Sequence, residues 1–206
     1  MSRHVLPMPV RVVVVLALVL LSGCAWHSGG PGLGLPNGRV LVFARVTEDQ
    51  NRPVAEAAAD LLAASLRESG DVLTVRQFLN EAAVVTPELW ASLLFARLQR
   101  GGWINPEEAE VLLNKFNVTT LVATEVTTYD QVWAKNGKFT RVSVEAQAYS
   151  TTAAVVLWRA RGENELEDKR GRAFQLAMED AIGAIAESVS PRSGFSIAGM
   201  WRSWRR

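Results

Sequence analysis

The 206-residue chain contains very little histidine and cysteine. Its two histidines, His4 and His27, and its one cysteine, Cys24, all precede the first segment that is patterned like a folded domain. A domain without these residues cannot hold a Ser-His-Asp or Cys-His triad, the usual zinc sites, thiol redox chemistry or a disulfide bond. A glycine-rich phosphate-binding loop is also lacking. We therefore expect neither a metal nor a dissociable cofactor.

The chain also lacks an excess of positive charge in its body. Of its 22 basic residues, Arg3 and Arg11 lie near the N-terminus, and Arg192, Arg202, Arg205 and Arg206 lie in the C-terminal tail. Residues 24–190 thus keep 16 basic residues against all 21 acidic ones. A mildly acidic body without a basic stripe argues against nucleic-acid binding.

The N-terminus has the pattern of an export signal. Positively charged residues precede an uninterrupted apolar run at 12–21, which is shorter than the roughly 20 residues that a membrane-spanning helix needs. The run ends in Leu21-Ser22-Gly23-Cys24, which resembles the bacterial lipobox read by the lipoprotein signal peptidase. The resemblance implies cleavage before Cys24 and a diacylglyceryl lipid on its thiol, so that residues 1–23 form a signal peptide.

Lipidation would place the chain on a membrane. Each buried CH₂ group of a lipid chain contributes about 0.8 kcal/mol, so several chains give lasting attachment. Ala25 stands where enteric inner-membrane lipoproteins carry aspartate, which favours the periplasmic face of the outer membrane without excluding the inner membrane. Residues 24–38 are rich in Gly and Pro and predict a flexible tether with a span of roughly 20 Å. The domain is therefore expected to lie close to its membrane.

Apolar periodicity predicts alternating strands and helices in the first half of the body. The expected strands are 40–46 and 72–78, and the expected helices are 53–69, one that Thr86 caps and Gly101-Gly102 end, and one that starts at Asn105 and carries Phe116. Pro87 and Pro106 occupy first helical positions, and Glu108 completes a capping box with Asn105. The second helix is filled by the apolar residues Leu89, Trp90, Leu93, Leu94, Ala96 and Leu98.

After residue 119, the spacing of the apolar residues changes from about 3.6 to 2. Residues 120–133 and 142–148 predict two strands joined at Asn136-Gly137, a pair typical of a type I′ hairpin. A third strand is expected at 153–160, a charged connection or helix start at 163–172, and a helix from Phe174 to Val189. The order β-α-β-α-α-β-β-β-α predicts an α+β domain over 39–190, with a single mixed sheet flanked by helices.

This order resembles a superfamily of periplasmic lipoproteins that includes the curli secretion channel protein CsgG, the penicillin-binding-protein activator LpoB and domains like the N-terminal one of TolB. The likeness rests on the opening strand and helix and on three further stretches, which read LTVRQFLNE at 73–81, FNVTTLVATEV at 116–126 and TAAVVLWRARG at 152–162. It implies non-enzymatic work in the cell envelope. The tether is shorter than that of the activator branch, and only one hairpin, within 129–149, matches the two that a channel subunit inserts.

The tail 191–206 is basic and aromatic. Ile197, Met200, Trp201 and Trp204 recur at helical spacing, edged by Arg202, Arg205 and Arg206. Such a helix would suit a bilayer interface or a partner groove, whereas Gly194 and Gly199 weaken it, so that a disordered or back-packed tail is the alternative.

Tryptophans and carboxylates supply the other candidates. Trp133, beside the predicted hairpin turn, is a candidate contact residue, whereas Trp90, Trp103 and Trp158 are expected in or at the edge of the core. Glu125, Asp130 and Glu145 could share a sheet neighbourhood and do acid–base work, but a solvated strand face is the simpler interpretation.

The sequence therefore predicts a lipid-anchored, non-catalytic binding or assembly factor of the cell envelope. Its partners would be the membrane and an envelope protein of unknown identity, and it could form a homo-oligomer. A regulator of a peptidoglycan synthase and a subunit of a curli-like secretion channel are the alternatives, and a hydrolase using carboxylates alone is a less favoured one.

Overall fold

The computed structural model describes residues 38–47, 51–86, 89–134, 137–153, 155–167 and 172–189. The strands are β1 Arg39–Ala44, β2 Val72–Thr74, β3 Val118–Ala134, β4 Gly137–Ser150 and β5 Val156–Glu167. The helices are α2 Arg52–Leu66, α3 Val75–Val85, α4 Trp90–Gln99, α5 Pro106–Phe116 and α6 Ala173–Val189. Among the described residues, none of these helices is long and apolar enough to cross a membrane.

The five strands form one mixed sheet in the order β2-β1-β3-β4-β5. β1 pairs in parallel with β2 and β3, and β3, β4 and β5 form an antiparallel meander. The predicted α+β class with a single mixed sheet is confirmed, and the elements follow the predicted order with one further helix, α3, after β2.

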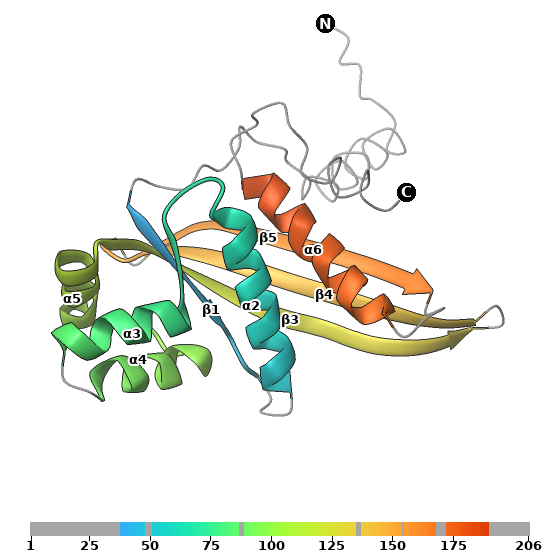
Figure 1. Ribbon diagram of the computed structural model, residues 1–206, viewed down its shortest axis with the longest axis horizontal. Coiled ribbons are helices and arrows are strands. Elements are labelled where there is room, and N and C mark those ends of the chain that lie inside the picture. The colour runs from blue at the N-terminus through green and yellow to red at the C-terminus, as the bar shows by residue number, and fades with distance from the viewer. Residues whose placement is uncertain are drawn as a thin grey trace, which may run out of the picture. The chain divides into compact units, whose positions relative to one another are not determined.

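The two faces of the sheet are covered differently. Helices α2 and α6 pack across one face and enclose a core made with β1, β3, β4 and β5. Helices α3, α4 and α5 pack on the other face, but only over β1, β2 and the beginning of β3, as Figure 1 shows. β1 is therefore buried from both sides, and the far parts of β3, β4 and β5 have helices on one side only.

Local signals explain where several elements begin and end. Asn105 accepts a hydrogen bond from the Glu108 backbone N–H, and the Glu108 carboxylate accepts one from the Asn105 backbone N–H, both at 2.8 Å, so the predicted capping box of α5 is present. Asn117 ends this helix in the left-handed conformation with φ of 55°, which asparagine tolerates better than most residues. Its backbone N–H bonds to carbonyls of the last turn.

The expected strand 72–78 is wrong beyond Thr74. The chain turns there into α3, because Thr74 and Gln77 form a second capping box. Thr86, expected to begin a helix, instead ends α3, where its backbone N–H bonds to the Ala82 carbonyl.

α4 buries only some of its apolar side chains. Its buried side chains are Ala91, Leu94, Phe95 and Leu98, whereas Leu89 and Leu93 are 70% and 66% exposed. The buried stripe therefore passes through Leu94 but not through the other two leucines.

β5 is displaced from its predicted position. It was expected at 153–160 and begins at Val156 instead, running through the charged stretch that was expected to be a connection or helix start. Residues 163, 165 and 167 are glutamates on the exposed side of this strand, whereas Asn164 and Leu166 face α6. Exposed and inward-facing side chains therefore alternate in this stretch as in any strand, but its many charged residues hid this alternation.

Candidate interaction surface

The meander leaves a large part of one sheet face without helices, and we call it the open face. Its register is set by cross-strand pairs such as Glu125 with Glu145, Asp130 with Arg141, and Arg141 with Glu165. The open face consists of Glu125, Thr128, Asp130, Val132, Phe139, Arg141, Ser143, Glu145, Gln147, Arg159, Arg161, Glu163, Glu165 and Glu167.

Charges of opposite sign alternate across the strands of the open face. Arg141 on β4 lies between Asp130 on β3 and Glu165 on β5, and its guanidinium is 2.6 Å from the Glu165 carboxylate. The hydrogen bond to Glu165 is the main cause that raises the pKa of Arg141 above its ordinary value. Exposed ion pairs therefore connect the three strands in this part of the surface and favour their register.

The carboxylates considered for acid–base work lie on this same face. Glu125 and Glu145 are direct cross-strand neighbours, and Asp130 is farther along β3. Arg161 on β5 is 3.5 Å from Glu145 and also pairs with Glu163. Glu125 and Glu145 thus belong to an ion-paired row of the sheet, whereas Asp130 is one of the residues that line a hollow of about 230 Å³ beside the bulge of β3.

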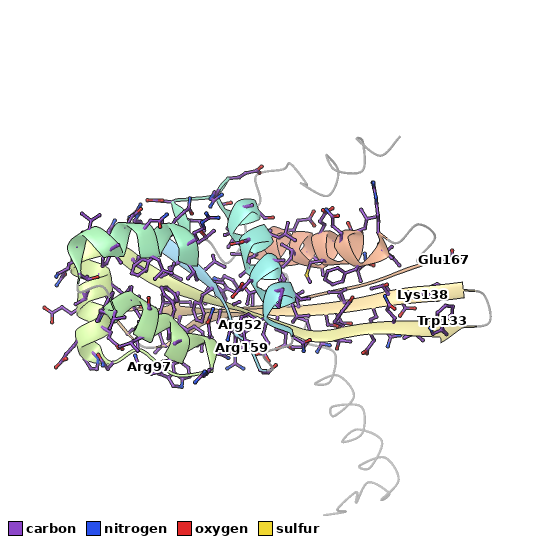
Figure 2. The ribbon with its side chains drawn as sticks, turned by 60° about the horizontal axis from the view of Figure 1, so that its bottom comes forward. Arg52, Arg97, Trp133, Lys138, Arg159 and Glu167 are labelled. Atoms are coloured by element: carbon purple, nitrogen blue, oxygen red, sulfur yellow. The ribbon has the colours of Figure 1, made fainter. Side chains whose placement is uncertain are left out.

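An aromatic residue marks the far end of the hairpin formed by β3 and β4. Trp133 is 77% exposed, and the amine of Lys138, its cross-strand partner, is 5.7 Å from the centroid of its ring. Figure 2 shows both residues at the end of the strands that extends away from α3, α4 and α5. An exposed tryptophan with a neighbouring cation is a common feature of contact surfaces.

The base of the hairpin is held to the body, in contrast to its end. Tyr129 packs against Phe174 of α6, with ring centroids 4.6 Å apart. A register shift between Val126 and Thr128 places Thr127 as an extra residue in β3, and such bulges bend a strand and increase its twist. The direction of the outer hairpin is therefore fixed by packing and by the bulge together.

A second aromatic group lies where the helical layer ends and the open face begins. Trp103 meets Tyr149 edge-on with centroids 5.1 Å apart, and it is 59% exposed, so it lies at the edge of the core. Arg45 donates a hydrogen bond to the Tyr149 hydroxyl, which donates one to Gln147. The sequence prediction missed Arg45, since only the end of β1 beside β3 brings it to Tyr149. Trp158 is buried as expected, and Trp90 stacks on Phe116 at the core edge.

The hollow beside β2 has no free charge to offer a ligand. It has a volume of about 570 Å³. Arg39 spans it with hydrogen bonds of 2.8 Å to both Glu81 and Asp71, and the pKa of Arg39 is raised chiefly by the bond to Glu81. Arg67 donates to Gln77 at 2.8 Å. These groups satisfy one another, so we assign this hollow a structural role.

The remaining predicted residues lie outside the described part of the chain. They are the lipobox residues Leu21, Ser22, Gly23 and Cys24, and the tail residues Ile197, Met200, Trp201, Arg202, Trp204, Arg205 and Arg206. Their roles remain predictions from the sequence.

Comparison with known proteins yields distant structural likenesses only. No family model matches the chain, and no curated protein sequence matches it. The PelC dodecamer from Paraburkholderia phytofirmans is 17% identical with a TM-score of 0.49, over 79% of this chain and 96% of that one. Lipoprotein GNA1162 from Neisseria meningitidis is 17% identical with a TM-score of 0.42, over 69% and 92%. The LpoB C-terminal domain from Salmonella enterica is 10% identical with a TM-score of 0.35, over 71% and 93%.

These likenesses do not show what the chain does. The similar proteins include a lipoprotein and the LpoB domain, which belongs to the resemblance drawn from the sequence. At these identities and TM-scores, only the chain's own residues indicate a function.

Proposed function

We propose that the chain is a lipid-anchored protein of the cell envelope, held on the periplasmic face of the outer membrane through Cys24, whose α+β domain binds an envelope protein without catalysing a reaction. The proposal combines the export and lipobox pattern at 12–24 with one structural observation. That observation is the exposed Trp133 at the far end of the hairpin formed by β3 and β4, on the same side of the sheet as Tyr129 and α6.

The hairpin supports binding because it presents a large, exposed aromatic side chain. Tryptophan buries a large area on contact and loses little side-chain entropy, and such residues dominate the energy of many interfaces. Lys138, whose amine is 5.7 Å from the centroid of the Trp133 ring, would add a charged group at the edge of this contact. A carboxylate hydrolase is less well supported, since Glu125 and Glu145 lie on a flat surface beside Arg161.

The two narrower alternatives differ in what they require of this hairpin. A synthase regulator would need only the exposed surface and a reachable partner. A channel subunit would need the hairpin to face lipid, where Asp130 and Arg141 on its open face would be costly to bury. We therefore favour the binding factor over the channel subunit.

Photo-crosslinking from the hairpin in living cells tests the binding proposal. A photoreactive amino acid at position 133 should capture a specific envelope protein, whose own crosslinked peptide then maps back to position 133. The same amino acid at Gln175, an exposed residue of α6 on the same side of the sheet but outside the hairpin, is the matched control. Equal capture from both positions, or none from position 133, would contradict binding through the hairpin.

The identity of the captured protein separates the alternatives. A penicillin-binding protein would support a synthase regulator. Secretion components, or large SDS-sensitive rings of the chain itself, would support a channel subunit. Trp133→Ala should abolish the specific capture, whereas Trp103→Ala, which changes an exposed tryptophan at the other end of the meander, should preserve it.

Membrane release tests the anchor separately. Cys24→Ala should move the protein from the membrane fraction to the periplasmic extract, because the thiol that accepts the lipid is gone. Protein that stays fully in the membrane fraction would show that another segment suffices for attachment, and the lipid-anchor proposal would then fail.

A further inference from the structure

β5 is a long edge strand. The strand order places β2 at one edge of the sheet and β5 at the other, and β2 has 3 residues whereas β5 has 12. Within the described part of the chain, no strand pairs with the outer side of β5. Such an edge presents a row of backbone N–H and C=O groups that can pair with another strand.

Among the devices that usually protect an edge strand, β5 relies on the charged side chains of its open face. Residues 156–167 include neither proline nor lysine. Ala160, Gly162 and Leu166 lie on the side of β5 that faces α6, so no charge points inward along this stretch. The only irregularity, a register shift opposite Ala148 and Tyr149, is confined to the beginning of the strand. With respect to the part of the chain that the structure describes, β5 is therefore open to pairing over most of its length.

The charges of β5 are divided into two blocks. Arg159 and Arg161 occupy the open face in the first half, and Glu163, Glu165 and Glu167 occupy it in the second half. If a second β5 aligned antiparallel with Gly162 opposite Gly162, Arg161 of each copy would lie opposite Glu163 of the other. In the same register, Arg159 of each copy would lie opposite Glu165 of the other. Opposite charges at such positions stabilise a strand pair, whereas like charges destabilise it.

Arg159 lacks a partner within the described residues. Its cross-strand neighbour on β4 is the neutral Gln147. Its guanidinium is exposed and forms neither an ion pair nor a hydrogen bond with the described part of the chain. This differs from Arg161, which pairs with Glu145 and Glu163. In the antiparallel pair, Glu165 of the second copy would supply the missing carboxylate.

We propose that β5 is a self-complementary edge on which a second copy of this chain docks, joining the two sheets into one through antiparallel β5 strands centred on Gly162. The proposal goes beyond the proposed function and does not depend on it, because the hairpin end with Trp133 stays free in this arrangement.

Such a pair would bring α6 of one copy beside α6 of the other. α6 packs on both β4 and β5, and Asn164 donates a hydrogen bond of 2.8 Å to Asp180 of this helix. The backbone of Ala181 in α6 lies directly against Gly162. The two α6 helices would therefore meet at the centre of the joint, where packed helices need axes about 8–10 Å apart.

Engineered disulfides test both the pairing and its register. In the double variant Arg159→Cys/Glu165→Cys, each new cysteine would lie opposite one of the other copy, at a Cα separation of about 5 Å that a disulfide accepts. The two positions are six residues apart on one strand, roughly 20 Å, so neither can bond within a chain. In each single variant, the two equivalent cysteines of the dimer would also be roughly 20 Å apart, which is too far for a disulfide.

The expected result is a covalent dimer of the double variant on a non-reducing gel. The full lipidated protein would be oxidised in its membrane, with wild type and both single variants as controls for Cys24. The proposal is overturned if the double variant stays monomeric under oxidation. It is also overturned if a single variant crosslinks as efficiently, since the copies would then meet in another way.

Charge reversal gives a second measurement that does not rely on cysteine. Arg159→Glu would place the new glutamate opposite Glu165 of the other copy, at two symmetric positions. The dimer Kd should therefore rise by on the order of tenfold, as measured by sedimentation in detergent. Arg76→Glu is the matched control, because Arg76 is an exposed arginine on α3 that makes no ion pair with the described residues. An equal Kd for Arg159→Glu and wild type would count against the proposal, as would a monomeric wild-type protein.

Discussion

Gly162 of β5 lies so close to Ala181 of α6 that a β-carbon on the glycine would be 1.9 Å from the alanine carbonyl oxygen. The obstacle is backbone and cannot rotate away. The absence of a side chain at position 162 therefore allows α6 to lie directly on the sheet.

Gly162→Ala is expected to destabilise the domain by about 3 kcal/mol or more, because overpacking against a fixed backbone forces the helix away from the strand. Gly183→Ala is the control within α6 itself, where nothing lies within 4 Å of the added carbon. This second change should raise stability by about 0.5–1 kcal/mol, because alanine favours the helix. Urea unfolding followed by circular dichroism measures both, and equal midpoints for the two variants would contradict the packing of α6.

Phe78 of the unpredicted helix α3 is fully buried, with ring centroids 4.8 Å from Phe116 and 5.5 Å from Phe95. Phe78→Ala should cost about 3–5 kcal/mol. Phe139→Ala, which truncates a half-buried ring on the open face, should cost much less. Thermal unfolding compares the two, and similar losses would show that the α3 core is not closed around Phe78.

Asn117 has a φ of 55° at the end of α5. Asn117→Gly should leave stability unchanged or raise it slightly, because glycine adopts this conformation without steric strain. Asn117→Ala should lower stability by about 1 kcal/mol, since a β-carbon with fewer local hydrogen bonds disfavours left-handed backbone. Denaturant midpoints that rank alanine above glycine would contradict the assigned conformation.

Two ion pairs differ in how firmly they are held. Arg39 is partly buried and makes two hydrogen bonds to Glu81, whereas Arg141 is exposed beside Glu165. A double-mutant cycle should give about 1 kcal/mol for Arg39 with Glu81. The coupling for Arg141 with Glu165 should be smaller and should vanish in 1 M salt. A larger coupling for the exposed pair would contradict this ranking.

The alkaline response follows from the raised pKa of Arg39. The stabilisation that arises from its charged form is fully present below the ordinary guanidinium pKa and is lost only as the pH rises through the raised one. The guanidinium itself should therefore cause no change in the Arg39–Glu81 coupling between neutral and moderately alkaline pH. A marked fall in the coupling over that range would contradict the assignment of Glu81 as the main cause of the raised Arg39 pKa.

Local chemistry made part of the fold predictable. The start of α5 could be predicted because Asn105, Pro106 and Glu108 act within one turn. The antiparallel strands β3 and β4 could be predicted because apolar and polar residues alternate over many positions. The sequence also held the start signal of α3, in Thr74 and Gln77, but the apolar residues beside them gave it the pattern of a strand.

Tertiary structure decides the features that were not predictable. Leu89 and Leu93 are as apolar as Leu94, and only the position of α4 on the sheet determines which of them is buried. The proximity of Glu125 and Glu145 could be proposed from the hairpin, but the arginine that accompanies them comes from β5, whose extent was mispredicted. The open face exists because three helices cover only one end of the sheet, and periodicity does not report such coverage.

The burial of β1 from both sides links the two cores of the domain. Val40 and Val42 belong to the core under α2 and α6, and Leu41 and Phe43 belong to the core under α3, α4 and α5. Neither core can open without exposing the other side of the same six-residue strand, so the domain should unfold as one cooperative unit. Amide hydrogen exchange would then be slowest in β1 and would approach its free rate at the Trp133 end of the hairpin. The interaction surface could thus fluctuate locally without loss of the fold that supports it.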